Sequence, residues 1–142
     1  MIPPTGLYLI DTSAWGRLRH PVVQKRISAI LEERLAATCL PLDLEDGRSA
    51  RDFRDAMAVR ARRAELMIEL PITTAVATRA RDLQLALTTR GYHRAASPVD
   101  VTVAAVAAEH SAVVLHYDRD YDLIRDVGGP RCEWIAPAGT LT

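Results

Sequence analysis

Short apolar segments recur along the chain, separated by longer stretches with helical character. The first, residues 7–10 (LYLI), is too short for a helix and ends abruptly at Asp11. Uniformly apolar segments of this length are typical of strands that are covered on both faces, as in a parallel sheet. Further strands are expected at residues 37–40, 68–72, 112–117 and 132–135. The sequence therefore predicts a short, mainly parallel sheet.

The stretches between these segments predict helices. Residues 22–35 place Val23, Ile27 and Ile30 on one helical face, whereas the helix that follows Ser97 is apolar nearly all round. Because parallel strands need crossover connections, this alternation indicates an α/β sandwich. The predicted helices span residues 12–20, 22–35, 49–66, 73–89 and 97–110, with shorter ones after Pro41 and Asp118.

Length and composition bound the class of protein. A chain of 142 residues with 49% hydrophobic and 25% charged residues suits a single folded domain, 1–142. Its formal net charge of zero excludes a globally cationic nucleic-acid binder. There is no apolar run of membrane-spanning length and no signal-peptide pattern at the start. Cys39 and Cys132 lack metal-ligand spacing, so we expect reduced thiols in a cytoplasmic protein.

Acidic residues stand where a carboxylate is energetically costly. Asp11 and Asp118 each follow a buried strand, Asp100 opens the apolar helix, and Glu45 lies in an otherwise apolar stretch. The carboxyl ends of parallel strands meet at one edge of a sheet, where α/β folds place their sites. Carboxylates that converge there repel one another unless a cation is bound. Oxygen ligands favour Mg²⁺, with Mn²⁺ as the alternative, so we expect such a site with Asp120 close by.

Each acid also has a structural alternative. Asp11 can cap the helix that follows it, and Ser97 and Asp100 have the spacing of a capping box. Glu45 can be a solvated acid near a positive helix end. A calcium loop in the DRDYD segment is excluded, because Leu123 occupies the position that requires glycine.

Basic residues concentrate in the middle of the chain. Residues 48–94 contain ten basic and five acidic residues, and residues 95–142 contain three basic and seven acidic ones. An arginine-rich surface beside an acidic pocket suits a phosphate backbone, although a solvated helix face with internal ion pairs is the alternative. His93 lacks a second ligand at zinc spacing. The candidate RNA contacts are Arg48, Arg51, Arg90, His93 and Arg94.

Four motifs occur in the same order as in PIN-domain ribonucleases, and the chain most resembles the VapC-type toxins of bacterial toxin–antitoxin modules, particularly those of actinobacteria. The end of the chain, CEWIAPAGT, is also similar to that group. The motifs are DTSAW at 11–15, ATCLPLDLEDGRSAR at 37–51, RGYHRAASPVDVTVAAVA at 90–107 and LHYDRDYDLI at 115–124.

The resemblance implies a PIN-like three-layer sandwich and a Mg²⁺-dependent endoribonuclease that cuts structured RNA, tRNA above all. Direct metal ligation is implied for Asp11 and Asp100, with Ser13 bonded to a ligand carboxylate. Asp118 and Asp120 compete for the place of the fourth acid, and Asp43 or Asp46 could be mistaken for Glu45. The family's four catalytic acids correspond to Asp11, Glu45, Asp100 and Asp118.

The resemblance also implies partners: a small antitoxin that covers the acidic groove, and a second copy of the chain in a homodimer. Trp15 and Leu18 are candidate apolar anchors, although burial in the core explains Trp15 equally well. Other functions remain open at this point. A phosphatase would require a DxDx[TV] motif where Thr12 and Ser13 stand, and a receiver domain would require a lysine that the chain does not offer, since Lys25 is its only one. A PIN fold that binds RNA or a partner without cleavage is the third alternative.

Overall fold

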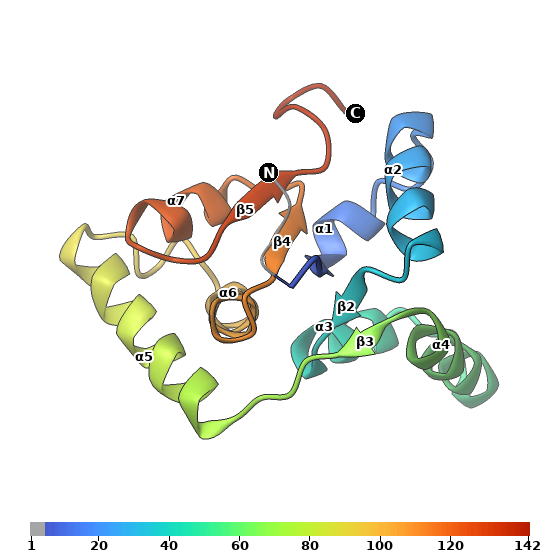
Figure 1. Cartoon of the computed structure of the whole chain (residues 1–142), viewed down its shortest axis with the longest axis horizontal. Helices are drawn as coiled ribbons and strands as arrows, with labels where there is room; N and C mark the ends of the chain where they lie inside the picture. The colour runs from blue at the N-terminus through green and yellow to red at the C-terminus, as the bar shows by residue number, and fades with distance from the viewer. Residues whose placement is uncertain (1–4) are drawn as a thin grey trace.

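One parallel sheet organises the protein. The structure, a computed structural model, describes residues 5–142, so that residues 1–4 of the predicted domain lie outside the described residues. The sheet has the order β3-β2-β1-β4-β5, and every pairing is parallel. Helices lie on both sides of it (Figure 1), which confirms the predicted three-layer α/β sandwich. The strands are β1 (Tyr8–Ile10), β2 (Ala36–Thr38), β3 (Ile68–Glu69), β4 (Val113–His116) and β5 (Cys132–Trp134).

The elements follow the predicted order with several corrected boundaries. The helix expected over 22–35 ends at Glu32, and the strands expected over 37–40 and 68–72 end at Thr38 and Glu69. The helix expected over 12–20 already ends at Trp15, where Gly16 donates its N–H to the carbonyl of Thr12 and the chain continues in turns. The helix expected over 49–66 begins only at Phe53, because the Asp52 side chain accepts a hydrogen bond from the N–H of Asp55 at 2.8 Å and caps it. The described helices are α1 (Thr12–Trp15), α2 (Pro21–Glu32), α3 (Leu40–Gly47), α4 (Phe53–Leu66), α5 (Thr74–Thr89), α6 (Pro98–Glu109) and α7 (Asp120–Asp126).

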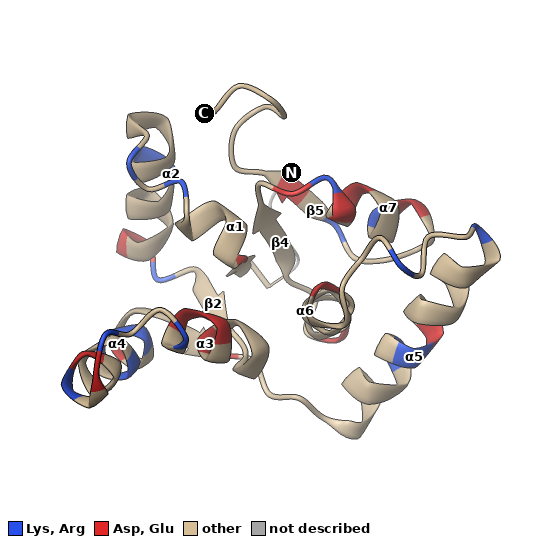
Figure 2. Ribbon diagram, turned by 180° about the vertical axis from the view of Figure 1, so that it is seen from behind, with Lys and Arg blue, Asp and Glu red and all other residues tan. Residues whose placement is uncertain are grey.

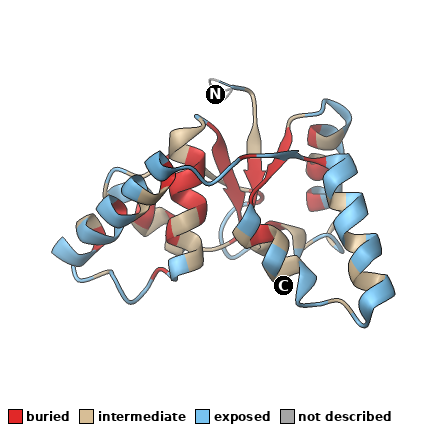
Figure 3. Cartoon of the chain, turned by 90° about the horizontal axis from the view of Figure 1, so that it is seen from below, coloured by how far each residue is buried: buried red, intermediate tan, exposed pale blue. Residues whose placement is uncertain are grey.

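Both faces of the central strands β2, β1 and β4 are buried, whereas the edge strand β3 is exposed. Leu9 and Val114 pack with α5, α6 and α7, whereas Ile10 and Leu115 pack with α1 and α2 on the other face. Figure 3 shows the central strands and the inner helices as the buried part of the molecule. This burial on two faces explains why the strand segments are uniformly apolar.

The helix α6 lies deepest. Val103 and the next four residues are completely buried, because α6 packs between α5 and the sheet. In the part of the chain that the structure describes, no helix is long and apolar enough to cross a membrane.

The topology brings the ends of β1 and β4 together. These two strands are neighbours at the centre of the sheet, yet the chain leaves β1 toward β2 on one side and leaves β4 toward β5 on the other. The loops that follow β1 and β4 therefore diverge at the carboxyl ends of these strands. Open α/β sheets bind their ligands at this place. Asp11 directly follows β1, and Asp118 follows β4 by two residues.

Candidate active site

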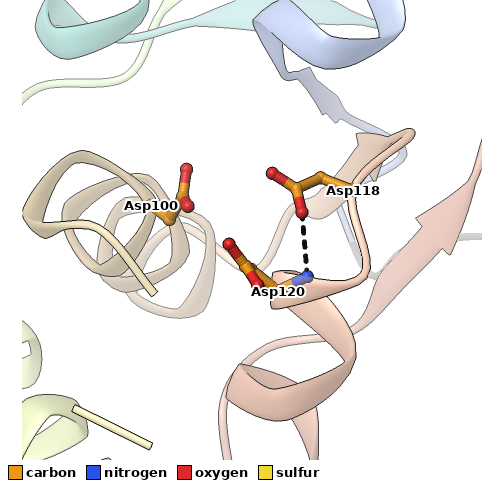
Figure 4. A group of neighbouring side chains, drawn as sticks. All are labelled: Asp100, Asp118 and Asp120. Atoms are coloured by element: carbon orange, nitrogen blue, oxygen red, sulfur yellow. Dashed lines mark hydrogen bonds between the residues drawn. The ribbon is translucent and has the colours of Figure 1, made fainter. Parts of the chain in front are cut away.

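Three carboxylates share one space at this edge of the sheet. Asp100 lies in the first turn of α6, Asp118 follows β4, and Asp120 begins α7. One oxygen of each lies within 4.8 Å of one oxygen of the other two. Figure 4 shows the three side chains pointing toward one another from the two helices and the loop. Asp118 and Asp120 thus both face Asp100, so both candidates for the fourth acid lie in the cluster.

Backbone hydrogen bonds hold these acids in place. The Asp118 carboxylate accepts a hydrogen bond from the N–H of Asp120 at 2.9 Å, drawn as a dashed line in Figure 4. The hydroxyl of Ser97 accepts one from the N–H of Asp100 at 3.1 Å, so that the predicted helix cap is present. Ser97 also hydrogen-bonds the Asp100 carboxylate through its side chain and its backbone, and that carboxylate still has an oxygen within reach of the other two acids.

The electrostatics of the cluster favour a bound cation. Burial and the nearby carboxylates of Asp11 and Asp118 raise the pKa of Asp100 to about 6. The pKa of Asp120 is raised as well, by burial and by Asp118. Within residues 5–142, none of the ion pairs involves Asp100, Asp118 or Asp120. A partly buried set of oxygen donors with uncompensated charge fits a hard divalent ion such as Mg²⁺, with water in the remaining positions.

Asp11 forms the neighbouring wall of the site. Its side chain is nearly buried, at 5% exposure, and it is held by three hydrogen-bond donors. One carboxylate oxygen accepts from the N–H of Ser13 at 3.0 Å and from its hydroxyl at 2.6 Å. The other accepts from the hydroxyl of Tyr121 at 2.7 Å, and that hydroxyl lies 3.5 Å from a carboxylate oxygen of Asp100. Asp11 therefore caps α1 and reaches the three-acid cluster through one tyrosine hydroxyl.

The three acids of α3 have separate surroundings. Glu45 accepts a hydrogen bond from the hydroxyl of Thr12 at 3.0 Å. Thr12 is the residue that follows Asp11 in the chain. Asp43 and Asp46 instead bind the guanidinium of Arg63, at 2.8 Å and 3.1 Å. Of the three, Glu45 is thus the carboxylate that contacts the residue next to Asp11, and its catalytic role stays a prediction.

The arginine-rich segment is only partly an exposed surface. Arg63 turns inward, where its side chain is 11% exposed and also donates to the hydroxyl of Thr38 at 2.8 Å. Arg63 is therefore not available as a surface cation, because two carboxylates of α3 pair with its guanidinium. Figure 2 shows the basic residues of α4 beside the acidic residues of α3.

The five candidate RNA contacts are all exposed. Arg51 is paired with Asp55 at 3.5 Å and also donates its backbone N–H to that carboxylate, so the alternative of an internal ion pair applies to it. Arg90, His93 and Arg94 lie between the end of α5 and the start of α6, which is the helix that carries Asp100. Their position near the entrance to α6 agrees with the prediction, although no contact joins them to the acids.

Two residues of the site were missed by the sequence analysis. Tyr121 is completely buried, and His116, also completely buried, accepts a hydrogen bond from the N–H of Asp118 on Nδ1 at 3.1 Å. The two rings are 4.9 Å apart, and burial lowers the pKa of His116. A tyrosine amid the acids of DRDYD was visible in the sequence, but only the fold shows that its hydroxyl faces Asp11.

Comparison with known proteins agrees with this geometry. The model of the PIN domain family matches residues 8–127. Ribonuclease VapC21 of Mycobacterium tuberculosis is 36% identical over 136 residues, which cover 96% of this chain and 99% of that protein. Ribonuclease VapC51 of the same species is 37% identical over 134 residues, with 94% and 96% covered.

Solved structures show the same fold. DNA-bound VapBC from Salmonella typhimurium matches with a TM-score of 0.73 at 15% identity, over 92% of this chain and 98% of that one. VapBC-1 from nontypeable Haemophilus influenzae also gives 0.73 at 15% identity, over 91% and 98%. The chain belongs to the PIN-domain family, in its VapC-type branch, as the order of its motifs predicted.

Proposed function

We propose that this protein is the endoribonuclease toxin of a VapBC-type toxin–antitoxin module, acting in the cytoplasm on structured RNA, tRNA above all. The observation that carries the proposal is the convergence of carboxylates from β1, α6, the end of β4 and α7, with no basic side chain paired to the three-acid cluster in the described chain. The relatives named ribonucleases support the reaction class.

Asp100 is the central residue of the proposed mechanism. It faces Asp118 and Asp120 on one side and reaches Asp11 through the Tyr121 hydroxyl on the other. We assign Asp100 and Asp11 as ligands of Mg²⁺, or of Mn²⁺ in its place, and Asp118 and Asp120 as further ligands, directly or through water. A bound Mg²⁺ would supply a water of lowered pKa and positive charge beside the phosphate that is attacked.

The other residues of the site position these groups. Ser13 orients the Asp11 carboxylate through its hydroxyl and its N–H. Glu45, held by Thr12, would bind the cation through water or orient the attacking water. The exposed basic side chains (Arg48, Arg51, Arg90, His93 and Arg94) would contact the phosphate backbone of the RNA.

RNA cleavage with Mg²⁺ tests the proposal. Purified tRNA and an unstructured RNA of equal length are incubated with the protein, with the protein plus EDTA, and with the Asp11→Ala and Asp100→Asn variants. We expect cleavage of tRNA that EDTA and both variants abolish. Cleavage that persists in EDTA or in both variants would exclude the metal mechanism, and wild-type protein that binds RNA without cutting it would favour the non-cleaving PIN module.

A small antitoxin is the proposed partner, since several solved structures with this fold are VapBC complexes. A hollow of about 310 Å³ between α1 and α4 is lined by Trp15, Leu18 and Leu66, and it offers an apolar segment of the antitoxin a place to bind. An antitoxin arginine that enters the acidic cluster would compensate its charge. Expression of the toxin alone should arrest growth, and coexpression of the small neighbouring gene should relieve the arrest.

A homodimer is the proposed assembly of the toxin itself. Large apolar side chains are exposed on α3 and α4, among them Phe53 at 80% exposure and Leu44 at 62%. Contiguous exposed apolar side chains of this kind mark interaction surfaces. Sedimentation equilibrium of the wild type and of Phe53→Ser separates a dimer through this surface from a monomer.

A further inference from the structure

Tyr121 lies at the junction of the acidic residues. It is the second residue of α7, its side chain is completely buried, and its ring packs in the core that covers one face of the sheet. The ring lies 4.9 Å from the ring of His116, whose Nδ1 accepts the N–H of Asp118. A rigid aromatic ring thus places a single hydroxyl at the carboxyl ends of β1 and β4.

The Tyr121 hydroxyl has one proton to donate, and two carboxylates lie within its reach. It lies 2.7 Å from an oxygen of Asp11 and 3.5 Å from an oxygen of Asp100, so its proton is donated mainly to Asp11. Burial and these two acids raise the pKa of the phenol well above its ordinary value, which keeps it a donor.

Donors from two directions immobilise the Asp11 carboxylate. Ser13 of α1 occupies one of its oxygens with two hydrogen bonds, and Tyr121 of α7 occupies the other with one. A carboxylate oxygen can accept two hydrogen bonds or ligands, so the oxygen bound to Tyr121 keeps a free lone pair. Rotation of the carboxylate would break hydrogen bonds in a nearly buried setting, which makes the orientation of this lone pair rigid.

We infer that Tyr121 is a positioning residue of the metal site, which orients the Asp11 carboxylate and spaces it from Asp100 so that both present an oxygen to one divalent cation. The inference rests on the proposed function in assuming that Asp11 and Asp100 are the metal ligands. Groups that orient ligand carboxylates commonly change metal affinity or activity by about 10–100-fold when they are removed.

The test compares two tyrosines that each lose one hydroxyl. Tyr121→Phe removes the hydrogen bond to Asp11 and keeps the ring in the core. Tyr117→Phe is the matched control, because Tyr117 is also buried and its hydroxyl accepts a hydrogen bond from the N–H of Leu141 at 2.9 Å. Mn²⁺ binding is measured by calorimetry for the wild type and both variants, and their thermal unfolding is recorded in EDTA.

We expect both variants to unfold at a slightly lower temperature, but only Tyr121→Phe to bind Mn²⁺ roughly 10-fold more weakly. Where RNA is cleaved, the Mn²⁺ concentration for half-maximal rate should rise in Tyr121→Phe while the KM for RNA stays unchanged. Mn²⁺ affinity of Tyr121→Phe within twofold of the control would overturn the inference. Wild-type protein that binds no Mn²⁺ would overturn it as well.

A double-variant comparison separates positioning from a general loss of packing. If Tyr121 acts through Asp11, adding Tyr121→Phe to Asp11→Asn should weaken Mn²⁺ binding no further, because the two changes are coupled. An additional 10-fold loss in that background would contradict the inference. Calorimetry does not depend on cleavage, so a protein that binds Mn²⁺ without cutting RNA would disprove the proposed function and still test Tyr121.

Discussion

Two groups of acidic residues lie near the carboxyl edge of the sheet, and their charges are compensated in different ways. Asp43 and Asp46 on α3 face the inward-turned Arg63, at 2.8 Å and 3.1 Å. Asp100, Asp118 and Asp120 face one another, and no basic side chain of the described residues pairs with them. The charges of the first group are paired within the fold, whereas the second group has no ion pair to a basic side chain among the described residues.

The presence or absence of a basic partner distinguishes two kinds of acid. Paired acids stabilise the fold, and acids without a partner are free to bind a ligand. Both groups contain carboxylates that follow a strand, β2 for Asp43 and Asp46 and β4 for Asp118 and Asp120, and the second group adds Asp100 from α6. Arg63 joins α4 to α3 and β2, so its ion pairs contribute to folding. Burial raises the pKa of Asp100 to about 6, and repulsion from Asp11 and Asp118 adds to the shift. Under the proposed function, a bound cation would offset this electrostatic cost.

Of the changes predicted for these two groups of acids, removal of Arg63 should lower the free energy of unfolding the most. Arg63→Ala removes a mostly buried side chain and its three hydrogen bonds, and we expect the free energy of unfolding to fall by about 3 kcal/mol. Urea denaturation measures the loss, and Arg54→Ala, at an exposed position on the same helix, is the control that should change it by less than about 0.5 kcal/mol. Equal effects of both variants would show that the Arg63 network contributes nothing special.

Divalent metal should stabilise the protein through the acids of the proposed metal site and not through Asp43 and Asp46. At a concentration of about 100 times its Kd, Mn²⁺ should raise the free energy of unfolding by about 2.7 kcal/mol. Urea denaturation in Mn²⁺ and in EDTA gives this increment, which Asp100→Asn should abolish. Arg63→Ala should lower the baseline and keep the increment. An increment that survives in Asp100→Asn would locate the metal elsewhere.

Two acids one residue apart should have opposite roles. Glu45→Gln should lower the rate of RNA cleavage by about 10-fold and leave stability nearly unchanged, since it removes a charge placed toward Thr12. Asp46→Asn should weaken the Arg63 network and leave cleavage unchanged. Single-turnover cleavage and urea denaturation are measured for both variants. The same pattern in the two would contradict the assignment of Glu45 to the site.

The stability of the metal-free protein should depend on pH because Asp100 titrates. This is the smallest of the predicted changes in stability. The folded pKa of about 6 lies above the ordinary value of 3.8, so the contribution of this group is present below pH 3.8 and is lost as the pH rises through 6. In EDTA, the stability of the wild type relative to Asp100→Asn should therefore fall by about 1 kcal/mol between pH 4.5 and 7.5. A difference that is constant with pH would show that Asp100 is not perturbed.

Much of the fold could be predicted from local sequence. Uniformly apolar segments indicated strands buried on two faces, and the alternation with helices indicated a parallel sheet. The boundaries that failed depended on competing local signals: Gly16 closes α1 early, and Asp52 caps α4 later than Ser49 would. Such competition is decided by hydrogen bonds that only the folded backbone offers.

The candidate site was predicted as a set of residues, and its pairwise geometry was not. Asp11, Asp100 and Asp118 were recognised because each acid follows or opens a buried element, which is a local property. Their connection through Tyr121 spans 110 residues between Asp11 and the phenol, and no local pattern encodes it. Likewise, nothing in an arginine-rich helix shows which arginine turns inward.

By itself, the sequence determined the class of fold, the carboxylates that lie at one edge of its sheet and the family to which the chain belongs, because these depend on patterns within a few residues. Tertiary structure alone decided which acids remain without a basic partner. Arg63 reaches Asp43 across 20 positions of the chain, and its guanidinium compensates charge only where the fold brings it within hydrogen-bond distance. Whether a carboxylate stabilises the fold or binds a cation therefore depends on its neighbours in space.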